Sequence, residues 1–171
     1  MKIVEGYKTF RPPFDAAALV ARLIDGLPAR CGSGLHAIVL TDTASLSRSQ
    51  RRGRAWSGQK KYHVGHVLGV YHPAWNGEPP WIELFMDKIL AGQRLLTLPI
   101  IRELVVSRVL FHELGHHIHY TQEPMHRDRE AIADQWQRRL GRRFFRTRYR
   151  LLFPLLLLLG RAESWFRRRA A

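Results

Sequence analysis

A pentapeptide with the spacing of a metal site, His112-Glu113-Leu114-Gly115-His116, lies in the second half of the chain. Two histidines four residues apart project from one face of an α-helix, where both imidazoles can bind a single Zn²⁺. Glu113 lies about 100° further round the helix, close enough to reach a metal-bound water without binding the metal. The alternative is that both histidines are ordinary residues of a helix surface or core. The motif therefore predicts a zinc site that needs a third ligand.

The first candidate for that ligand is Glu130, which lies 14 residues after His116, near the expected start of the next helix. An antiparallel return would bring its carboxylate back to the metal, and Asp134, on the same helical face, can accept the free N–H of a ligating histidine. The helix dipole also favours a carboxylate near a helix N-terminus, which explains Glu130 without a metal. His126 and Asp128 are alternative third ligands if the intervening turn folds back further.

The chemistry that such a site supplies is hydrolysis. One Zn²⁺ per chain, held by three protein ligands, keeps a fourth position for water, lowers the pKa of that water and polarises a carbonyl. Glu113 is expected to act as the general base and to return the proton to the leaving amine. His119 is either a substrate contact or a cap of the helix C-terminus, whereas His117 is expected to point away. The candidates for oxyanion or substrate contacts are Tyr120, His126, Arg127 and Tyr149.

The positions His112, Glu113, His116, Glu130 and Asp134 resemble the pattern of the zincin metallopeptidases, in particular the gluzincin group, in which HExxH is followed by a glutamate ligand in an ExxAD-like motif. The HELGH form followed by an Arg-Glu-Ala segment is also similar to the IrrE/ImmA-type cytoplasmic peptidases. The resemblance covers residues 80–140. It implies a minimal zincin fold of the α+β class, with a small mixed sheet, an active-site helix and a following ligand helix.

Two related patterns differ in the third ligand. In metzincins a glycine and a histidine ligand follow the second histidine by three and six residues, but here these positions hold His119 and Gln122, which excludes that group. A histidine ligand at His126 would instead resemble the SprT-like proteases, which act on DNA-bound proteins.

Two helices are expected to hold the site. The first begins at Pro99 and continues through apolar residues at helical spacing. A break at Glu123-Pro124 separates it from a second helix, which is expected over residues 128–140 and should end at Gly141. These helices position the candidate ligands.

The preceding part of the chain predicts a further helix over residues 14–27, with Asp15 as its N-cap, and strands over 36–41, 63–71 and 81–86. The resemblance to zincins implies that substrate pairs with an edge strand above the active-site helix, and 81–86 is the natural candidate. The alternative is a buried strand with Trp81 and Phe85 in the core. The stretch 45–61, whose six cations fall within 48–61 and which has no acid, predicts a mobile basic loop.

Length and composition favour one compact domain: the chain has 171 residues and 46% hydrophobic side chains, which excludes wholesale disorder. We expect residues 1–141 to form the metallopeptidase domain and residues 142–171 to form a basic, leucine-rich segment that is packed on it or peripheral. The lone Cys31 excludes an intramolecular disulfide and favours a reducing compartment. The N-terminus lacks the apolar core of a secretory signal, so a cytoplasmic location is expected.

The formal net charge of +14 is concentrated in the C-terminal segment, since residues 138–171 hold 11 arginines against Glu163. The apolar run 151–159 is too short to span a bilayer, which needs about 20 residues. Three interpretations of the segment stay open: a helix packed on the domain with leucines 155–159 in its core, an interfacial segment on anionic lipid, or a nucleic-acid arm with aromatic residues between cations. The 48–61 loop can add to either charged interface.

These observations predict a zinc metallopeptidase, a hydrolase that cleaves peptide or protein substrates by Glu-assisted attack of a zinc-bound water. The alternative is a non-catalytic regulatory protein that binds nucleic acid or a membrane surface, in which zinc is structural or absent.

Overall fold

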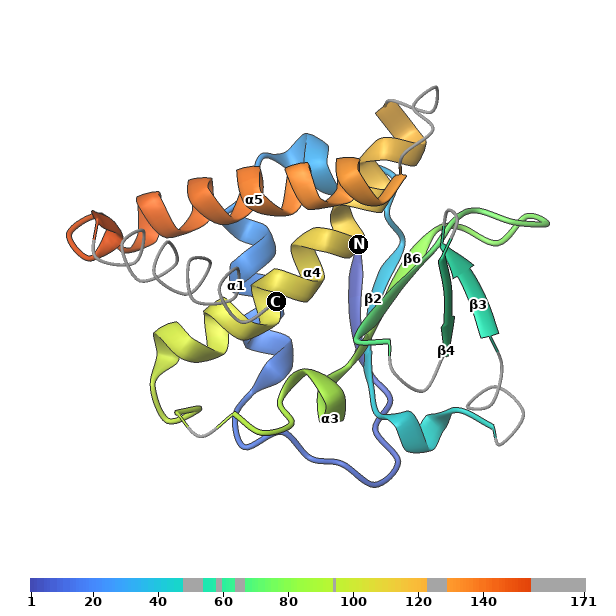
Figure 1. The fold of residues 1–171 in the computed structure, drawn as a ribbon, viewed down its shortest axis with the longest axis horizontal. Helices are drawn as coiled ribbons and strands as arrows, with labels where there is room; N and C mark the ends of the chain where they lie inside the picture. Colours follow the sequence, from blue (N-terminus) through green and yellow to red (C-terminus); the bar gives the residue numbers. More distant parts are fainter. Residues whose placement is uncertain (48–53, 58–59, 64–66, 94, 123–128, 155–171) are drawn as a thin grey trace.

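The computed structural model describes residues 1–47, 54–57, 60–63, 67–93, 95–122 and 129–154 (Figure 1). For the strands 54–57 and 60–63 it describes the backbone alone. The described residues form the expected α+β fold, with helices packed against one face of a small mixed sheet. The helices are α1 (Ala16–Asp25), α3 (Met86–Ile89), α4 (Pro99–Gln122) and α5 (Arg129–Arg148), with 3-10 turns η1 (Ala29–Gly32) and η2 (Thr43–Ser45). The strands are β1 (Lys2–Glu5), β2 (Ala37–Thr41), β3 (Arg54–Ser57), β4 (Lys60–His63), β5 (Gly69–His72) and β6 (Trp81–Phe85).

The main sheet has the strand order β1-β2-β6-β5. Strands β1, β2 and β6 are parallel, while β5 runs antiparallel to β6. The strand expected over 81–86 therefore exists as β6, but it lies inside the sheet, and the expectation that it forms the edge beside the site is wrong. Its burial explains the difference: Ile82 and Leu84 are fully buried, as in a central strand. The edge nearest the site is β5.

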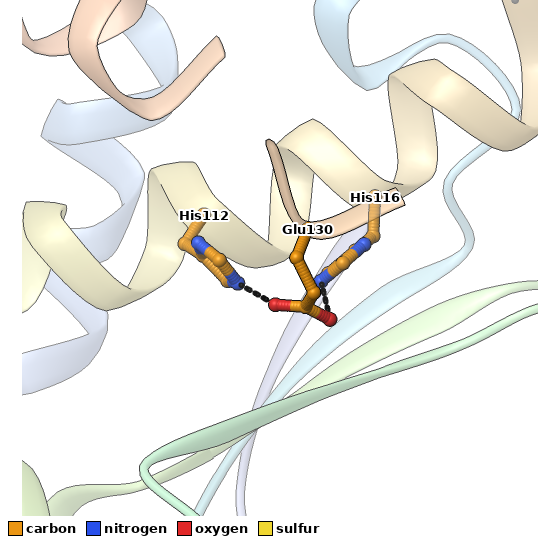
Figure 2. Close-up of side chains that lie close together, drawn as sticks. All are labelled: His112, His116 and Glu130. Atoms are coloured by element: carbon orange, nitrogen blue, oxygen red, sulfur yellow. Dashed lines mark ion pairs between the residues drawn. The ribbon is translucent and has the colours of Figure 1, made fainter. Parts of the chain in front are cut away.

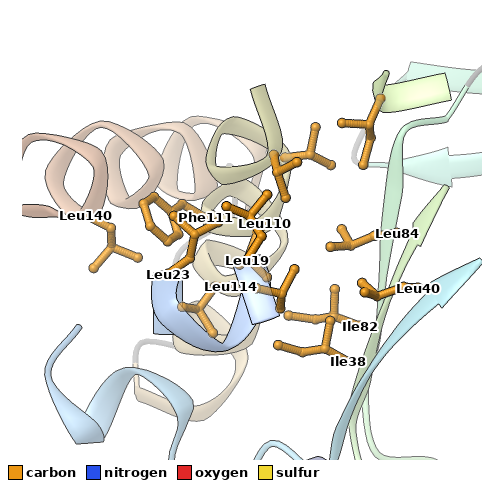
Figure 3. Close-up of a cluster of buried hydrophobic side chains, with 14 of the residues drawn as sticks. Leu19, Leu23, Ile38, Leu40, Ile82, Leu84, Leu110, Phe111, Leu114 and Leu140 are labelled. Atoms are coloured by element: carbon orange, nitrogen blue, oxygen red, sulfur yellow. The ribbon is translucent and has the colours of Figure 1, made fainter. Parts of the chain in front are cut away.

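The hydrophobic core lies between the sheet and the helices, as Figure 3 shows. Ile38, Leu40, Ile82 and Leu84 project from β2 and β6 towards the helices. Helix α4 lies in the middle of this arrangement, and its residues at helical spacing meet both the sheet and the surrounding helices. The buried apolar residues of α4 are Val106, Val109, Leu110, Phe111, Leu114 and Ile118. This burial confirms the helix that was expected to begin at Pro99.

Helix α5 continues beyond its expected end. Gly141 does not stop the helix, which extends to Arg148, so that prediction is wrong. Leu140, Phe144 and Phe145 are buried in the core, and the ring of Phe144 meets that of Phe111 edge to face at 6.2 Å. A glycine weakens a helix interior by only about 1 kcal/mol, which the burial of two phenylalanines exceeds.

The remaining predictions have mixed outcomes. Helix α1 confirms the helix over 14–27, and the Asp15 side chain caps it by accepting from the Ala18 N–H. The expected basic loop contains the β3–β4 hairpin, so it is only in part a loop, and 48–53 and 58–59 lie outside the described residues. The strand expected over 63–71 is divided between β4 and β5. None of the described helices is long and apolar enough to cross a bilayer.

Candidate metal centre

Helix α4 presents two imidazoles side by side. The ring centroids of His112 and His116 lie 4.9 Å apart with their planes nearly perpendicular. Both side chains are partly exposed, at 24% and 13%. This arrangement follows from the four-residue spacing, which places the two residues one turn apart on one helix face.

Helix α5 brings a carboxylate to the same point (Figure 2). The Nε2 atom of His112 lies 3.5 Å from one oxygen of Glu130, and the Nε2 atom of His116 lies 3.6 Å from the other. One ligand atom from each of the three residues lies within 4.8 Å of the other two. Ligand atoms around a tetrahedral Zn²⁺ at about 2.1 Å are separated by about 3.4 Å. The donor types suit zinc, and the two nitrogen–oxygen separations are close to this value.

The approach of the two helices depends on Gly115. A Cβ atom at this position would lie 2.8 Å from both the Cα and the carbonyl oxygen of Ala133. Backbone atoms cannot move aside as a flexible side chain can, so any larger residue at 115 would push α5 away from α4. Glu130 lies one turn before Ala133 on α5, and the missing side chain of Gly115 thus controls how near its carboxylate comes to the histidines.

Asp134 lies next to the cluster on the outer side of His112. Its Oδ1 is 3.1 Å from the Nδ1 of that histidine. A carboxylate accepts the Nδ1–H, which leaves the Nε2 lone pair directed at Glu130 and free for a metal. The structure thus brings Asp134 to the place expected for an orienting carboxylate.

Burial keeps His116 neutral. The pKa of His116 is lowered to about 4, chiefly because burial disfavours the imidazolium, and the neighbouring His112 and His119 add to the effect. At neutral pH the ring nitrogen is therefore unprotonated, which is the form that binds a metal ion.

Glu113 lies beside the cluster but is not part of it. Only 7% of the residue is exposed, and burial, with a smaller contribution from Glu130, raises its pKa to about 8, against the opposing effect of the Tyr71 backbone N–H. Gly69 on β5 makes room for this side chain, because a Cβ there would lie 2.9 Å from Glu113 Cγ. Strand β5 and helix α4 thus enclose the carboxylate between them.

A cavity of about 460 Å³ adjoins this carboxylate. It extends from His112 and Glu113 along α4, and one wall comes from β5 and the residues before it. The cavity has both apolar and polar walls, formed by Val67, Leu68, Gly69, Ile89, Gln93, Val105, Arg108, Val109, His112, Glu113, Asp134 and Gln137. Its size and position suit a side chain or short segment of a bound peptide.

The candidates for oxyanion or substrate contacts do not all lie near the cluster. Tyr120 lies one turn after His116, and its hydroxyl accepts a hydrogen bond from Arg129 at 2.6 Å. Tyr149 is not brought to the site: it stacks on Phe145 near the far end of α5 and bonds to Glu103. The remaining candidates, His126, Arg127 and Asp128, lie outside the described residues.

The two further histidines of α4 have different surroundings. His117 points away from the cluster, as expected, and its Nε2 donates to the Ser33 carbonyl at 2.9 Å. His119 is buried with its ring 6.0 Å from that of Tyr120. Neither histidine is among the three residues that converge on the candidate metal position.

Tyr71 is a site residue that the sequence analysis missed. Its backbone N–H reaches Glu113, and its hydroxyl lies 3.3 Å from the Nδ1 of His117. Burial raises the pKa of its phenol to about 12, so the hydroxyl stays protonated. No local signal in the sequence marks Tyr71, because it meets α4 only through the pairing of β5 with β6.

A scan against protein-family models finds no matching model, and searches of curated proteins and of solved structures find no match either.

Proposed function

We propose that this chain is a zinc-dependent peptidase of zincin type. The observation that carries the proposal is the convergence of His112, His116 and Glu130 from two helices, with the buried Glu113 and an open cavity directly beside them. His112, His116 and Glu130 would hold one Zn²⁺, and Asp134 would orient His112. When bound, the ion supplies a Lewis acid that makes a water molecule more acidic and polarises the substrate carbonyl.

Glu113 is the proton carrier in this proposal. Its carboxylate lines the cavity in which water and the scissile peptide bond meet. In its ionised form, which a nearby metal cation would favour over the protonated form that burial favours, Glu113 accepts a proton from the attacking water and then delivers that proton to the amine that leaves. The Tyr71 backbone N–H holds the carboxylate in position, and the surrounding side chains limit its contact with bulk water.

Substrate is expected to bind along β5. The Phe85 N–H donates to the Leu68 carbonyl, so the backbone groups of Gly69 and Tyr71 face away from β6 by the alternation of an antiparallel pair. The Tyr71 N–H meets Glu113 on this side, so the backbone groups of Gly69 and the Tyr71 carbonyl are the ones that a peptide can pair with. An extended peptide that adds to this edge would pass the candidate metal position and would place a side chain in the cavity.

The first test is the zinc content of the purified chain and of its Glu130→Ala variant after exhaustive dialysis against metal-free buffer. We expect one zinc per chain in the parent protein and a much weakened site in the variant, while Glu5→Ala, on the opposite edge of the sheet, keeps its zinc. Zinc retained equally by Glu130→Ala would move the third ligand to His126 or Asp128. No zinc in either protein would overturn the proposal.

The second test is cleavage of a mixed peptide library, followed by mass spectrometry. Cleavage should stop with a chelator and return with added zinc. Glu113→Gln should lower the rate by about 10³-fold while keeping its zinc, because the amide preserves shape but cannot carry the proton. A zinc-loaded chain that cleaves no peptide would favour a non-catalytic role.

A further inference from the structure

The outward face of α5 carries a row of cations. Arg138, Arg142 and Arg146 are all exposed and follow one another at four-residue intervals, about 6 Å along the helix axis. They lie on the side opposite Leu140 and Phe144, which face the core. The row therefore points to solvent.

Two more arginines, Arg139 and Arg143, widen this row towards η1. Burial raises the pKa of the Cys31 thiol, and the charges of Arg30, Arg143 and Arg139 act against that effect, which places all three cations near one point. We call Arg138, Arg139, Arg142, Arg143 and Arg146 the cationic face of α5.

The cationic face has no acidic partner among the described residues. The chain holds no Asp or Glu between 135 and 154. Arg148, which lies off this face, is paired with Glu103, and Arg139 lies over the ring of Trp136. The side chains of Arg138, Arg142, Arg143 and Arg146 form no ion pair or hydrogen bond within the described part of the chain. Such a surface suits a ligand with several negative charges.

Two exposed leucines follow α5 in the chain. Leu151 is 93% exposed and Leu152 is 50% exposed, directly after the end of α5. The sequence then continues with the leucines 155–159. Nucleic-acid phosphates would satisfy the arginines but would leave Leu151 and Leu152 in water. A lipid surface satisfies both, since its phosphates bind the cations and its acyl chains receive the apolar side chains.

We propose that the cationic face of α5, together with Leu151 and Leu152, binds the surface of an anionic lipid bilayer. The row begins one turn after Asp134, since Arg138 lies about 40° round the helix from Asp134 and about 80° from Glu130. A bilayer on this face would therefore lie beside the candidate metal centre. The proposal does not depend on zinc or on catalysis.

The test is co-sedimentation of the full chain with vesicles of phosphatidylcholine alone or mixed with an equal part of phosphatidylglycerol. We expect binding to the anionic vesicles only, weakened by salt and unchanged by chelator. The triple variant Arg138→Gln, Arg142→Gln, Arg146→Gln should bind on the order of 100-fold more weakly, since each arginine at an anionic surface contributes about fivefold. The matched control Lys2→Gln, Lys8→Gln, Arg11→Gln removes the same charge elsewhere and should lose far less.

A second variant separates lipid from nucleic acid. Leu151→Ser combined with Leu152→Ser should weaken vesicle binding by about tenfold and leave any retention on duplex DNA unchanged. Equal binding to neutral vesicles, or equal losses in the two triple variants, would overturn the proposal. The proposal would also be overturned, in favour of a nucleic-acid site, by a third result. In that result none of these substitutions changes vesicle binding, and the α5 triple variant abolishes binding to duplex DNA. Thermal unfolding of each variant verifies that the fold is intact.

Discussion

Helix α4 buries two glutamates in very different surroundings. Near its start, Glu103 is fully buried and receives Arg148 at 2.9 Å and Arg22 at 3.4 Å. Ten residues later, Glu113 is almost as buried, but its neighbours are His112, Glu130 and a single backbone N–H from Tyr71. Two cations pair with Glu103, whereas no cation pairs with Glu113 among the described residues.

The difference separates a structural carboxylate from a candidate for chemistry. A buried charge is costly unless it is paired, so Glu103 ties α1 and α5 to α4 through its arginines. Glu113 lies next to an open cavity and a cluster of metal-ligand type, and this favours a role in chemistry. Both are Glu on the same helix, and only their partners distinguish them.

The largest effect should follow from breaking the Glu103 pair. Arg148→Leu leaves the buried Glu103 carboxylate with the more distant Arg22 and the Tyr149 hydroxyl, and we expect the free energy of unfolding to fall by about 3 kcal/mol. Urea unfolding measures this. The double variant Glu103→Leu, Arg148→Leu should recover most of the loss, because it removes both charges. A double variant as unstable as the single one would contradict the assignment.

A third buried carboxylate, Asp42, is stabilised by hydrogen bonds, and the pH dependence of protein stability can test its contribution. Burial raises its pKa, but hydrogen bonds from the backbone N–H groups of Phe10, Thr9 and Lys8 and from Ser45 outweigh this and hold the pKa well below its usual range. Its contribution is therefore present above the unfolded pKa of about 4 and is lost as the pH falls through the folded pKa. Asp42→Asn should lower stability by about 2 kcal/mol near neutral pH. In urea titrations at several pH values, this deficit should shrink on acidification.

The geometry of the candidate metal centre beside Glu113 depends on how closely α5 approaches α4. Gly115→Ala should destabilise the protein by about 1 to 2 kcal/mol and weaken zinc binding, because the new Cβ meets the Ala133 backbone. Gly141→Ala is the matched control, since its Cβ has nothing within 4 Å, and it should raise stability by up to about 1 kcal/mol. Thermal unfolding and zinc titration on both variants measure the contrast.

A smaller effect is expected at the orienting carboxylate. Asp134→Asn should weaken zinc affinity by about tenfold, because an amide holds the Nδ1–H of His112 less strongly than a carboxylate. Competition with a chromogenic chelator measures the affinity. Asp25→Asn, an exposed residue on α1, should leave it unchanged. Equal affinities in the parent protein and Asp134→Asn would remove Asp134 from the site.

The smallest effect on stability is expected for Glu113→Gln. Within the described part of the chain no cation pairs with Glu113, and the amide keeps the side-chain volume, so the free energy of unfolding should change by less than about 1 kcal/mol. A large loss in urea unfolding would show that Glu113 is a structural residue like Glu103.

Local patterns predicted the elements that matter most here. The apolar spacing from Pro99 and the cap at Asp15 indicated α4 and α1, and the four-residue spacing of His112 and His116 placed both rings on one face. These features depend on residues that are close together in the chain, so the sequence alone is enough to predict them. Local pattern alone wrongly predicted a helix end at Gly141, where the burial of Phe144 and Phe145 outweighs the weak helix propensity of glycine.

Only the tertiary structure decided the rest. Strand β1 has just two apolar residues, and it exists because it pairs with β2. Strand β5, and not β6, forms the edge of the sheet because β5 pairs with β6 on the side away from β2. This pairing also places Gly69 and Tyr71 beside Glu113. Residue types and spacing determined which side chains can bind a metal. The close packing of α5 on Gly115 determined that Glu130 reaches them, because such contacts join segments whose approach depends on the volume of every side chain between them.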